Sequence, residues 1–254
     1  MESGLYIKIQ QILCRHKKEI EDKYEFPGVK DANSNLRSAN TFFLGAVMDY
    51  QMDANMVWEN AEELVNMLGA DSLWKTIANM PEDSWLNMRK NDGGYYHRFW
   101  RASGQRGIAK RIHRIATNIV HKFNSDVRNV WKGRTADEVY EVLKNDVKVN
   151  LSRSDATINM IVLGLVGAGV VKGSSNVKAD MHVKKVLGRA ILGGEIDRDV
   201  DAIKLAQHIY PENPGDIDLP LFDIGKRFCK PTQPLCLECP LTSICKYKLT
   251  HQRK

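Results

Sequence analysis

The chain has 254 residues, of which 43% are hydrophobic, so it can bury one large core or two smaller ones and is not a disordered chain. Its formal net charge of +6 makes nucleic acid a candidate partner. The longest apolar run, residues 158–171, is interrupted by Asn159 and three glycines and is too short to cross a bilayer. Residues 1–23 lack the pattern of a secretory signal, and we expect a cytosolic protein.

Apolar residues recur at helical spacing along almost the whole chain, and no run alternates as a half-buried strand would. We therefore expect an all-α fold. The predicted helices cover about residues 4–22, 40–49, 53–68, 71–78, 82–89, 105–123, 136–145, 155–168, 181–192 and 198–208. Short helices with short connections predict a compact bundle in two lobes with a cleft between them.

The segment between Asp92 and Asp126 contains no acidic residue but seven basic ones, Arg98, Arg101, Arg106, Lys110, Arg111, Arg114 and Lys122. Four isoleucines recur at helical spacing from residue 108 to residue 119, which predicts one buried helix face. The opposite face then carries Lys110, Arg111 and Arg114, pointing outward. Such a face either lies along nucleic-acid phosphates or is only a solvated helix surface, and charge does not decide between them.

Four of the five cysteines lie close together with the spacing C-x6-C-x2-C-x5-C: Cys229, Cys236, Cys239 and Cys245. Disulfides are disfavoured in a cytosolic chain, so this group of thiols is expected to hold a metal or a cluster. Structural zinc sites usually pair two short C-x2–4-C units, whereas this run has one C-x2-C unit flanked by single cysteines. The spacing therefore favours a [4Fe-4S] cluster and leaves zinc as the alternative.

The segment FCKPTQPLCLECPLTSIC resembles the iron–sulfur loop that closes the endonuclease III and MutY branch of the helix-hairpin-helix DNA glycosylase superfamily. The resemblance implies a two-lobed all-α architecture, with a six-helix-barrel-like domain at residues 39–176 and a cluster domain made of residues 1–38 and 177–254. DNA would bind in the cleft between them. The cluster would be structural, and basic residues around its loop would contact DNA phosphates: Lys226, Arg227, Lys230 and Lys246. Lysines that are merely solvated are the alternative.

Residues 179–186, ADMHVKKV, are similar to the family's V-D-T-H-[IV]-x-R-[VL] element. The similarity implies that Asp180 is the catalytic carboxylate and that His182 is the family's histidine, a candidate DNA contact. Asp180 also precedes an amphipathic helix, and as its N-cap it would be kept ionised by backbone N–H groups and the helix dipole. An ionised carboxylate there can stabilise an oxocarbenium-like sugar or accept a proton from attacking water. An N-cap without a catalytic role is the alternative.

Two alignments compete for the family's L-P-G-[VI]-G hairpin. In the first, residues 151–156 (LSRSDA) replace it, and Ser154 or Asp155 stands where bifunctional members carry a nucleophilic lysine. In the second, residues 165–169 (LVGAG) form the hairpin and Lys172 is the nucleophile, which leaves only seven residues before Asp180. We prefer the first alignment. It implies a monofunctional enzyme that uses water as its nucleophile and leaves an intact abasic site.

Residues 41–53 resemble the family's helix ending in L-S-x-Q-x-x-D, which implies that Gln51 fills the gap left by an extruded base. A glutamine that only caps neighbouring helices is the alternative. The resemblance as a whole implies a monomeric, nucleoid-associated DNA glycosylase of base excision repair, which binds duplex DNA with a damaged, modified or mismatched base and hydrolyses its N-glycosidic bond. The alternatives are a bifunctional glycosylase/AP lyase using a lysine such as Lys172, a catalytically inactive lesion-DNA-binding relative, and an unrelated iron–sulfur redox protein.

Overall fold

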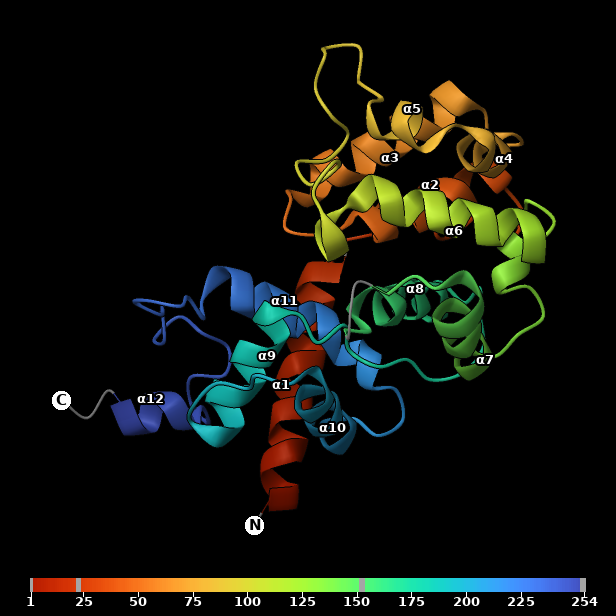
Figure 1. Cartoon of the computed structure of the whole chain (residues 1–254). Helices are drawn as coiled ribbons and strands as arrows, with labels where there is room; N and C mark the ends of the chain where they lie inside the picture. Colours follow the sequence, from red (N-terminus) through yellow and green to blue (C-terminus); the bar gives the residue numbers. More distant parts are fainter. Residues whose placement is uncertain (1, 22–23, 151–153, 252–254) are drawn as a thin grey trace. The chain divides into compact units, whose positions relative to one another are not determined.

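A computed structural model describes residues 2–21, 24–150 and 154–251 of the chain (Figure 1). Within these ranges the regular structure is helical, as predicted, apart from isolated bridges such as that between Thr135 and Lys172. None of the helices in these ranges is long and apolar enough to span a membrane. The chain divides into two compact units, which we call the central unit (Phe26–Gly173) and the terminal unit (Met1–Glu25 with Ser174–Lys254).

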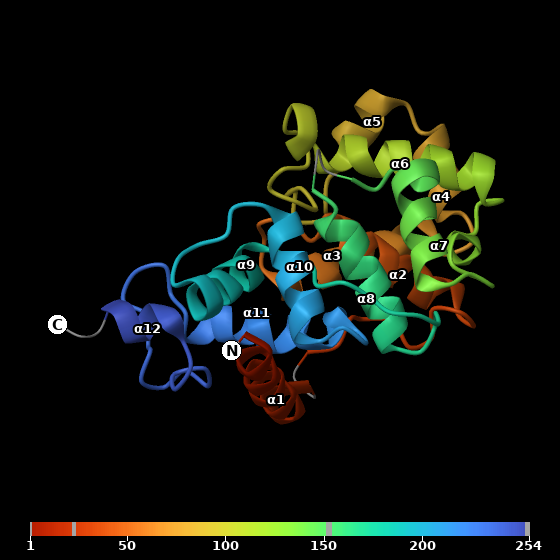
Figure 2. The ribbon, with the colours of Figure 1, turned by 90° about the horizontal axis from the view of Figure 1, so that it is seen from below.

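The central unit contains α2 (Leu36–Met48), α3 (Ala54–Leu68), α4 (Leu73–Asn79), α5 (Glu82–Leu86), α6 (Ile108–Lys122), α7 (Ala136–Glu141) and α8 (Ala156–Gly167). A π-helical turn, η4 (Val142–Val147), continues α7. Helix α2 is buried along residues 39–48 and packs against α3 and α8, and Figure 2 shows α8 running alongside it. All five tryptophans of the chain lie in this core or against it. A Cβ atom on Gly45 would lie 2.0 Å from the Trp58 ring, so glycine is what lets α2 and α3 approach closely.

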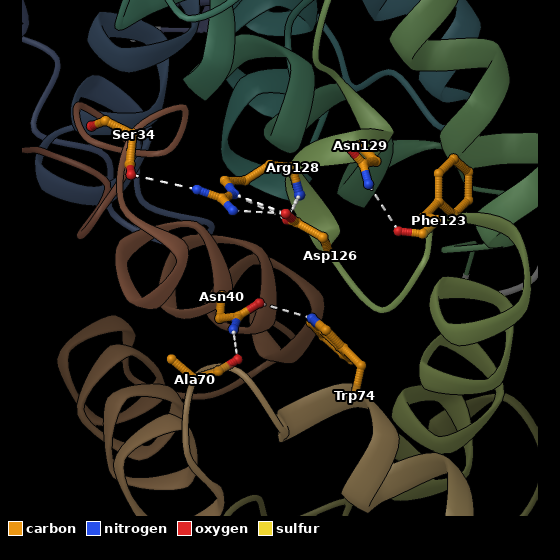
Figure 3. Close-up of polar contacts among 8 residues, drawn as sticks. All are labelled: Ser34, Asn40, Ala70, Trp74, Phe123, Asp126, Arg128 and Asn129. Atoms are coloured by element: carbon orange, nitrogen blue, oxygen red, sulfur yellow. Dashed lines mark hydrogen bonds and ion pairs between the residues drawn. The ribbon is translucent and has the colours of Figure 1, made fainter.

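Several polar side chains in the central unit, some fully buried and some partly exposed, are paired with one another and with the backbone (Figure 3). Asn40 is fully buried; its amide donates to the Ala70 carbonyl at 2.9 Å and accepts the indole N–H of Trp74 at 2.8 Å. Arg128 binds the carboxylate of Asp126 with an Nη2–Oδ2 distance of 2.7 Å. Because a buried polar group without a partner costs free energy, these pairs stabilise the connections between the helices.

The predicted buried face of α6 is correct, but one outward residue was assigned wrongly. Ile108 and Ile119 are fully buried, and Lys110 and Arg114 are exposed. Arg111 is only 3% exposed, and its Nε donates to the Val149 carbonyl at 2.8 Å. Burial lowers the pKa of Arg111 to about 9. The side chain points inward because the irregular segment after η4 places an unpaired carbonyl there, which a periodicity argument cannot foresee.

The terminal unit contains α1 (Glu2–Ile20), α9 (Met181–Leu187), α10 (Asp199–Ile209), α11 (Asp218–Arg227) and α12 (Lys246–His251), and a π-helical turn, η5 (Gly188–Leu192), continues α9. Helices α11 and α12 were not predicted. Proline and glycine normally interrupt helices, but Pro220 of α11 lies in the first turn, where its missing N–H is not needed. A Cβ atom on Gly225 would lie 2.7 Å from the Cβ of His182, so glycine allows α11 to pack closely on α9.

Helix α1 is attached to α11 through the buried carboxylate of Asp223, which is 1% exposed. His16 Nε2 lies 2.8 Å from Asp223 Oδ2, and the Tyr24 hydroxyl donates to Asp223 Oδ1 at 3.0 Å. Arg227 Nη1 adds an ion pair at 3.4 Å. The N-terminal helix therefore belongs to the same unit as the C-terminal third of the chain.

The boundary between the units differs from the predicted domain boundary at residues 26–38, which we assigned to the cluster domain. These residues belong to the central unit, because Val29 and Ala32 are part of its core and the Phe26 ring packs 6.1 Å from Phe42 and 6.0 Å from Trp58. This segment consists mostly of turns before α2, so helical periodicity gave no signal for where it packs.

Replacing Asn40 with alanine should destabilise the protein measurably. Asn40→Ala leaves the Trp74 indole N–H and the Ala70 carbonyl without their partners, and we expect the free energy of unfolding in urea to fall by about 2–4 kcal/mol. The matched control is Asn66→Ala, because Asn66 is exposed and only accepts a bond from Arg37. Equal losses for the two variants would contradict this account of the buried asparagine.

Candidate functional site

Asp180 is the N-cap of α9, as the sequence predicted. Its Oδ1 atom accepts the backbone N–H groups of His182 at 2.8 Å and Val183 at 3.0 Å. The side chain is half-buried, and Oδ2 accepts no bond from the described residues. The carboxylate is thus held in one orientation while one of its oxygens remains available to another molecule.

The turn before Asp180 has an unusual conformation and a buried support. Ala179 has φ +54°, in the left-handed region that side-chain-bearing residues rarely adopt, and it is buried. The preceding N–H, that of Lys178, donates to Asp218 Oδ1 at 2.6 Å. Asp218 is the first residue of α11 and is 8% exposed. Burial, with a further contribution from the negative charge of Asp180, raises the pKa of Asp218 to about 7.

His182 is in the first turn of α9, and its side chain packs against α11. Its ring packs edge-on against Phe222 with the ring centroids 5.3 Å apart, and its Nδ1 is buried without a hydrogen-bond partner among the described residues. This packing accounts for the position of the ring, and its contact with DNA stays a prediction.

The four clustered cysteines line one cavity in the terminal unit, together with Arg189, Phe228 and Tyr247. Burial raises the pKa of Cys239 to about 12 and also raises the pKa values of Cys229 and Cys236. Their thiols would therefore ionise only with a positively charged partner. No group of three or more His, Cys, Asp or Glu side chains in the described ranges is arranged around a single metal ion.

Arg189, which the sequence analysis missed, supports the cysteine loop. It lies in η5 and is 5% exposed; Nη1 donates to the Lys230 carbonyl at 2.7 Å and lies 3.7 Å from Cys229 Sγ. Nη2 donates to the Pro231 carbonyl at 3.1 Å. Lys185 is also buried, and no described residue is bonded to its Nζ. The only sequence signal for this pair was two basic residues on an otherwise apolar helix face.

In the central unit, Gln51 lies in the turn between α2 and α3 with φ +49° and lines an open hollow with about 1130 Å³ of empty space. Arg98 Nη2 donates to Gln51 Oε1 at 3.4 Å. The Phe99 N–H donates to His97 Nδ1 at 3.0 Å, so the ring proton is on Nε2, which lies 3.0 Å from the Tyr50 carbonyl. Burial lowers the pKa of His97 to about 4. A buried neutral imidazole therefore joins the Gln51 turn to the segment that follows Gly94.

Exposed arginines surround this hollow and stack on aromatic rings. The Arg89 guanidinium lies 3.6 Å from the Tyr95 ring centroid, and that of Arg98 lies 4.7 Å from the Phe99 centroid. Arg101 Nη1 donates to the Tyr95 hydroxyl at 3.2 Å. None of these arginines has an acidic partner within the part of the chain that the structure describes, so their charges are available to an anionic partner.

The segment between η4 and α8 occupies the hairpin position of the preferred alignment, although Leu151, Ser152 and Arg153 lie outside the described residues. Arg114 Nη2 donates to the carbonyls of Lys148 at 3.1 Å and Asn150 at 3.4 Å. The second alignment is wrong in its structural premise, because residues 165–167 are the end of α8 and open no helix. Lys172 is exposed, and its carbonyl accepts the N–H of Ala136 at 2.9 Å.

Asp155, one of the two residues that the preferred alignment puts at the lysine position of bifunctional glycosylases, is bonded to three side chains. Its Oδ2 accepts the Tyr140 hydroxyl at 2.5 Å and Lys144 Nζ at 3.1 Å, and its Oδ1 accepts the Asn150 amide at 2.9 Å. These bonds to Asp155 and to Tyr140 raise the pKa of Lys144. The one lysine that contacts this position is thus held in its protonated form.

The four predicted phosphate contacts around the cysteine loop are all exposed: Lys226, Arg227, Lys230 and Lys246. Arg227 is 49% exposed, pairs with Asp223 at 3.4 Å and stacks over the Phe228 ring at 4.9 Å. Lys230 donates to the Lys226 carbonyl. Their exposure is compatible with phosphate binding, which stays a prediction.

The all-helical fold is that of the helix-hairpin-helix DNA glycosylases, as the sequence predicted. A solved structure of a non-covalent endonuclease III–DNA complex matches 98% of this chain and 99% of its own with a TM-score of 0.63 and 18% identity. A thermostable thymine-DNA glycosylase matches 96% of each chain with a TM-score of 0.62 and 14% identity. Human adenine DNA glycosylase is 25% identical over 143 residues, which cover 48% of this chain and 26% of that protein, so the match spans about a quarter of its length. No protein-family model matches the chain.

The buried imidazole of His97 should make stability depend on pH. Its folded-state pKa of about 4 is below the ordinary value of 6.5, so the unfolded state takes up a proton first and stability is lost as the pH falls from about 6.5 to 4. The free energy of unfolding in urea, measured at pH 7 and at pH 4.5, gives the loss of stability between the two pH values. We expect this loss to be about 2–3 kcal/mol smaller in His97→Gln than in the wild type. His121→Gln, the same change at an exposed position of α6, should keep the wild-type pH dependence. Parallel curves for wild type and His97→Gln would show that the imidazole is not buried in its neutral form.

Proposed function

We propose that this protein is a DNA glycosylase that binds duplex DNA and hydrolyses the N-glycosidic bond of a damaged, modified or mismatched base. The observation that carries the proposal is Asp180, a carboxylate fixed by two backbone N–H groups at the start of α9, on a fold shared with endonuclease III. The motif around Asp180 predicted both its position in the chain and its capping role. Fold likeness alone would not carry an activity, and the oriented carboxylate supplies the chemistry.

The proposed reaction needs a negative charge where positive charge develops on the sugar. Cleavage of the bond between base and sugar gives an oxocarbenium-like transition state, which the Asp180 carboxylate can stabilise through its available Oδ2. The same oxygen can accept the proton of the attacking water. The water oxygen forms the new bond to C1′, the base leaves with the bonding electron pair, and the backbone stays intact.

DNA binding is supported by the hollow around Gln51. An enzyme that acts on a base must take it out of the stack, and the space it leaves has to be filled. The Gln51 side chain stands in a turn that His97 and Arg98 hold in place. The exposed arginines beside it can bind phosphates or stack on unpaired bases.

The proposed mechanism is monofunctional. A lyase needs an unprotonated amine that attacks C1′. In the preferred alignment Ser154 or Asp155 stands at the position of the family's lysine, and the neighbouring Lys144 is paired with Asp155 at 3.1 Å. Water is then the nucleophile, and an abasic site is the product.

We also propose that the four clustered cysteines hold a [4Fe-4S] cluster, because they line one cavity and their spacing has one C-x2-C unit flanked by single cysteines. When bound, the cluster would act as a structural cross-link. The buried side chains of Arg189 and Lys185 would offset the negative charge of its thiolate ligands. Arg189 would also fix the loop through the carbonyls of Lys230 and Pro231.

Incubation of the protein with duplexes carrying a panel of damaged, modified and mismatched bases, with free bases detected by mass spectrometry, tests the activity. We expect release of at least one base, and a fall in its single-turnover rate of about 100-fold or more in Asp180→Asn. Asp197→Asn, on the exposed surface of the same unit, should retain the wild-type rate. Borohydride should trap no covalent complex on an abasic duplex. Binding to these duplexes without release of any base would instead identify an inactive lesion-binding relative.

Metal analysis tests the cluster. Protein purified without oxygen should contain iron and acid-labile sulfide in equal amounts, about four of each per chain, with visible absorption. Cys239→Ser should lower both contents and the melting temperature, whereas Cys14→Ser, at a cysteine outside the cavity, should leave them unchanged. Stoichiometric zinc without sulfide would contradict the proposal.

A further inference from the structure

The turn that carries Asp180 requires an external support, and Asp218 supplies it. Ala179 occupies the left-handed region at φ +54°, which is unfavourable for a residue with a Cβ atom, so the turn persists because its surroundings hold it. On one side, Asp180 caps α9. On the other side, the Lys178 N–H donates to Asp218 Oδ1 at 2.6 Å. The strained residue thus lies between two carboxylate-to-backbone bonds.

Asp218 is itself rigidly placed. It begins α11, and α11 packs on α9 through the close contact of Gly225 with His182. Any movement of Asp218 relative to α9 would have to disturb that contact. The carboxylate is 8% exposed, so solvent cannot replace it as the acceptor for Lys178.

The charges around Asp218 distinguish it from an ordinary capping group. From the turn it is faced by the Asp180 carboxylate, which disfavours a second negative charge, and by Lys178, which favours one. In the helical turn before it, Asp216 is paired with Lys17 of α1 at 2.7 Å, and farther along α11, Asp223 is bonded to His16. The two neighbouring acids are therefore already paired, whereas the negative charge of Asp180 acts on Asp218.

We propose that Asp218 is a positioning residue for Asp180: it holds the Lys178–Asp180 turn, and in its protonated form it leaves the negative charge of the pair on Asp180. This inference rests on the proposed glycosylase activity. Ionisation of Asp218 at higher pH places two like charges side by side, and repulsion displaces the more exposed carboxylate, that of Asp180. Activity then falls as the pH rises through the titration of Asp218, near pH 7.

Two substitutions separate these roles. Asp218→Asn keeps an oxygen acceptor for the Lys178 N–H and removes the titration, so we expect the wild-type single-turnover rate at pH 6 and little decline towards pH 8, where the wild type declines. Asp218→Ala removes the acceptor, and we expect a rate about 10- to 100-fold lower at both pH values, with DNA affinity unchanged. A wild-type rate and pH profile in both variants would overturn the proposal while leaving the glycosylase function intact.

A measurement that needs no activity completes the test. Carboxyl NMR of the folded protein follows the titration of Asp218 in the wild type and in Asp180→Asn, and backbone hydrogen exchange follows the Lys178 amide. We expect Asp218 to titrate at lower pH in Asp180→Asn, and the Lys178 amide to exchange faster in Asp218→Ala. If the Asp218 titration and the Lys178 exchange rate are both unchanged, Asp218 interacts with neither Asp180 nor the Lys178 N–H, and the proposal is wrong. If these shifts occur but the wild type releases no base, the proposed function fails and the positioning role fails with it.

Discussion

The close packing of α9 on α11 is the constraint on which the terminal unit depends. It requires a glycine at position 225, because a Cβ atom there would overlap His182. Asp180 caps α9 and Asp218 is the first residue of α11, and the residues that follow the two helices, Arg189 and Cys229, line the cysteine cavity. One helix pair therefore fixes the carboxylates at one end and the cysteines at the other. Both α9 and α11 therefore contribute to the pair of carboxylates and to the cysteine cavity. A change in the packing of either helix would affect both places.

Buried arginines perform a common task in both units, which is to satisfy the carbonyl groups of irregular segments. Arg111 binds the Val149 carbonyl before α8, and Arg189 binds those of Lys230 and Pro231 in the cysteine loop. Loops of this kind cannot satisfy their own backbone, and a guanidinium offers five donors in a fixed plane. Burying such a charge is costly, so these arginines stay where a shaped loop is needed and no helix or strand can supply the bonds. The exposed arginines beside the Gln51 hollow have the opposite environment and keep their charge available.

Local signals in the sequence were sufficient for much of this structure. Helical periodicity predicted the all-α fold, and the spacing of four cysteines predicted that they lie together. The N-cap role of Asp180 depends only on the residues that follow it, so it too was predicted. Helix α11 was not, because Pro220 and Gly225 normally break helices and are tolerated here by position and by packing.

Residues that act through packing across long separations could not be predicted in the same way. Asp218 carries no motif, and it matters only because α11 brings it to Lys178, forty residues earlier in the chain. Arg111 lies at helical spacing beside an apolar face, and periodicity places it outside, whereas the carbonyl of Val149 holds it inside. In both cases the determining partner is a backbone group of an irregular segment. Because every residue carries the same backbone groups, the sequence does not indicate which of them will bind a distant side chain. The residues that support a functional turn can therefore be identified only from the fold.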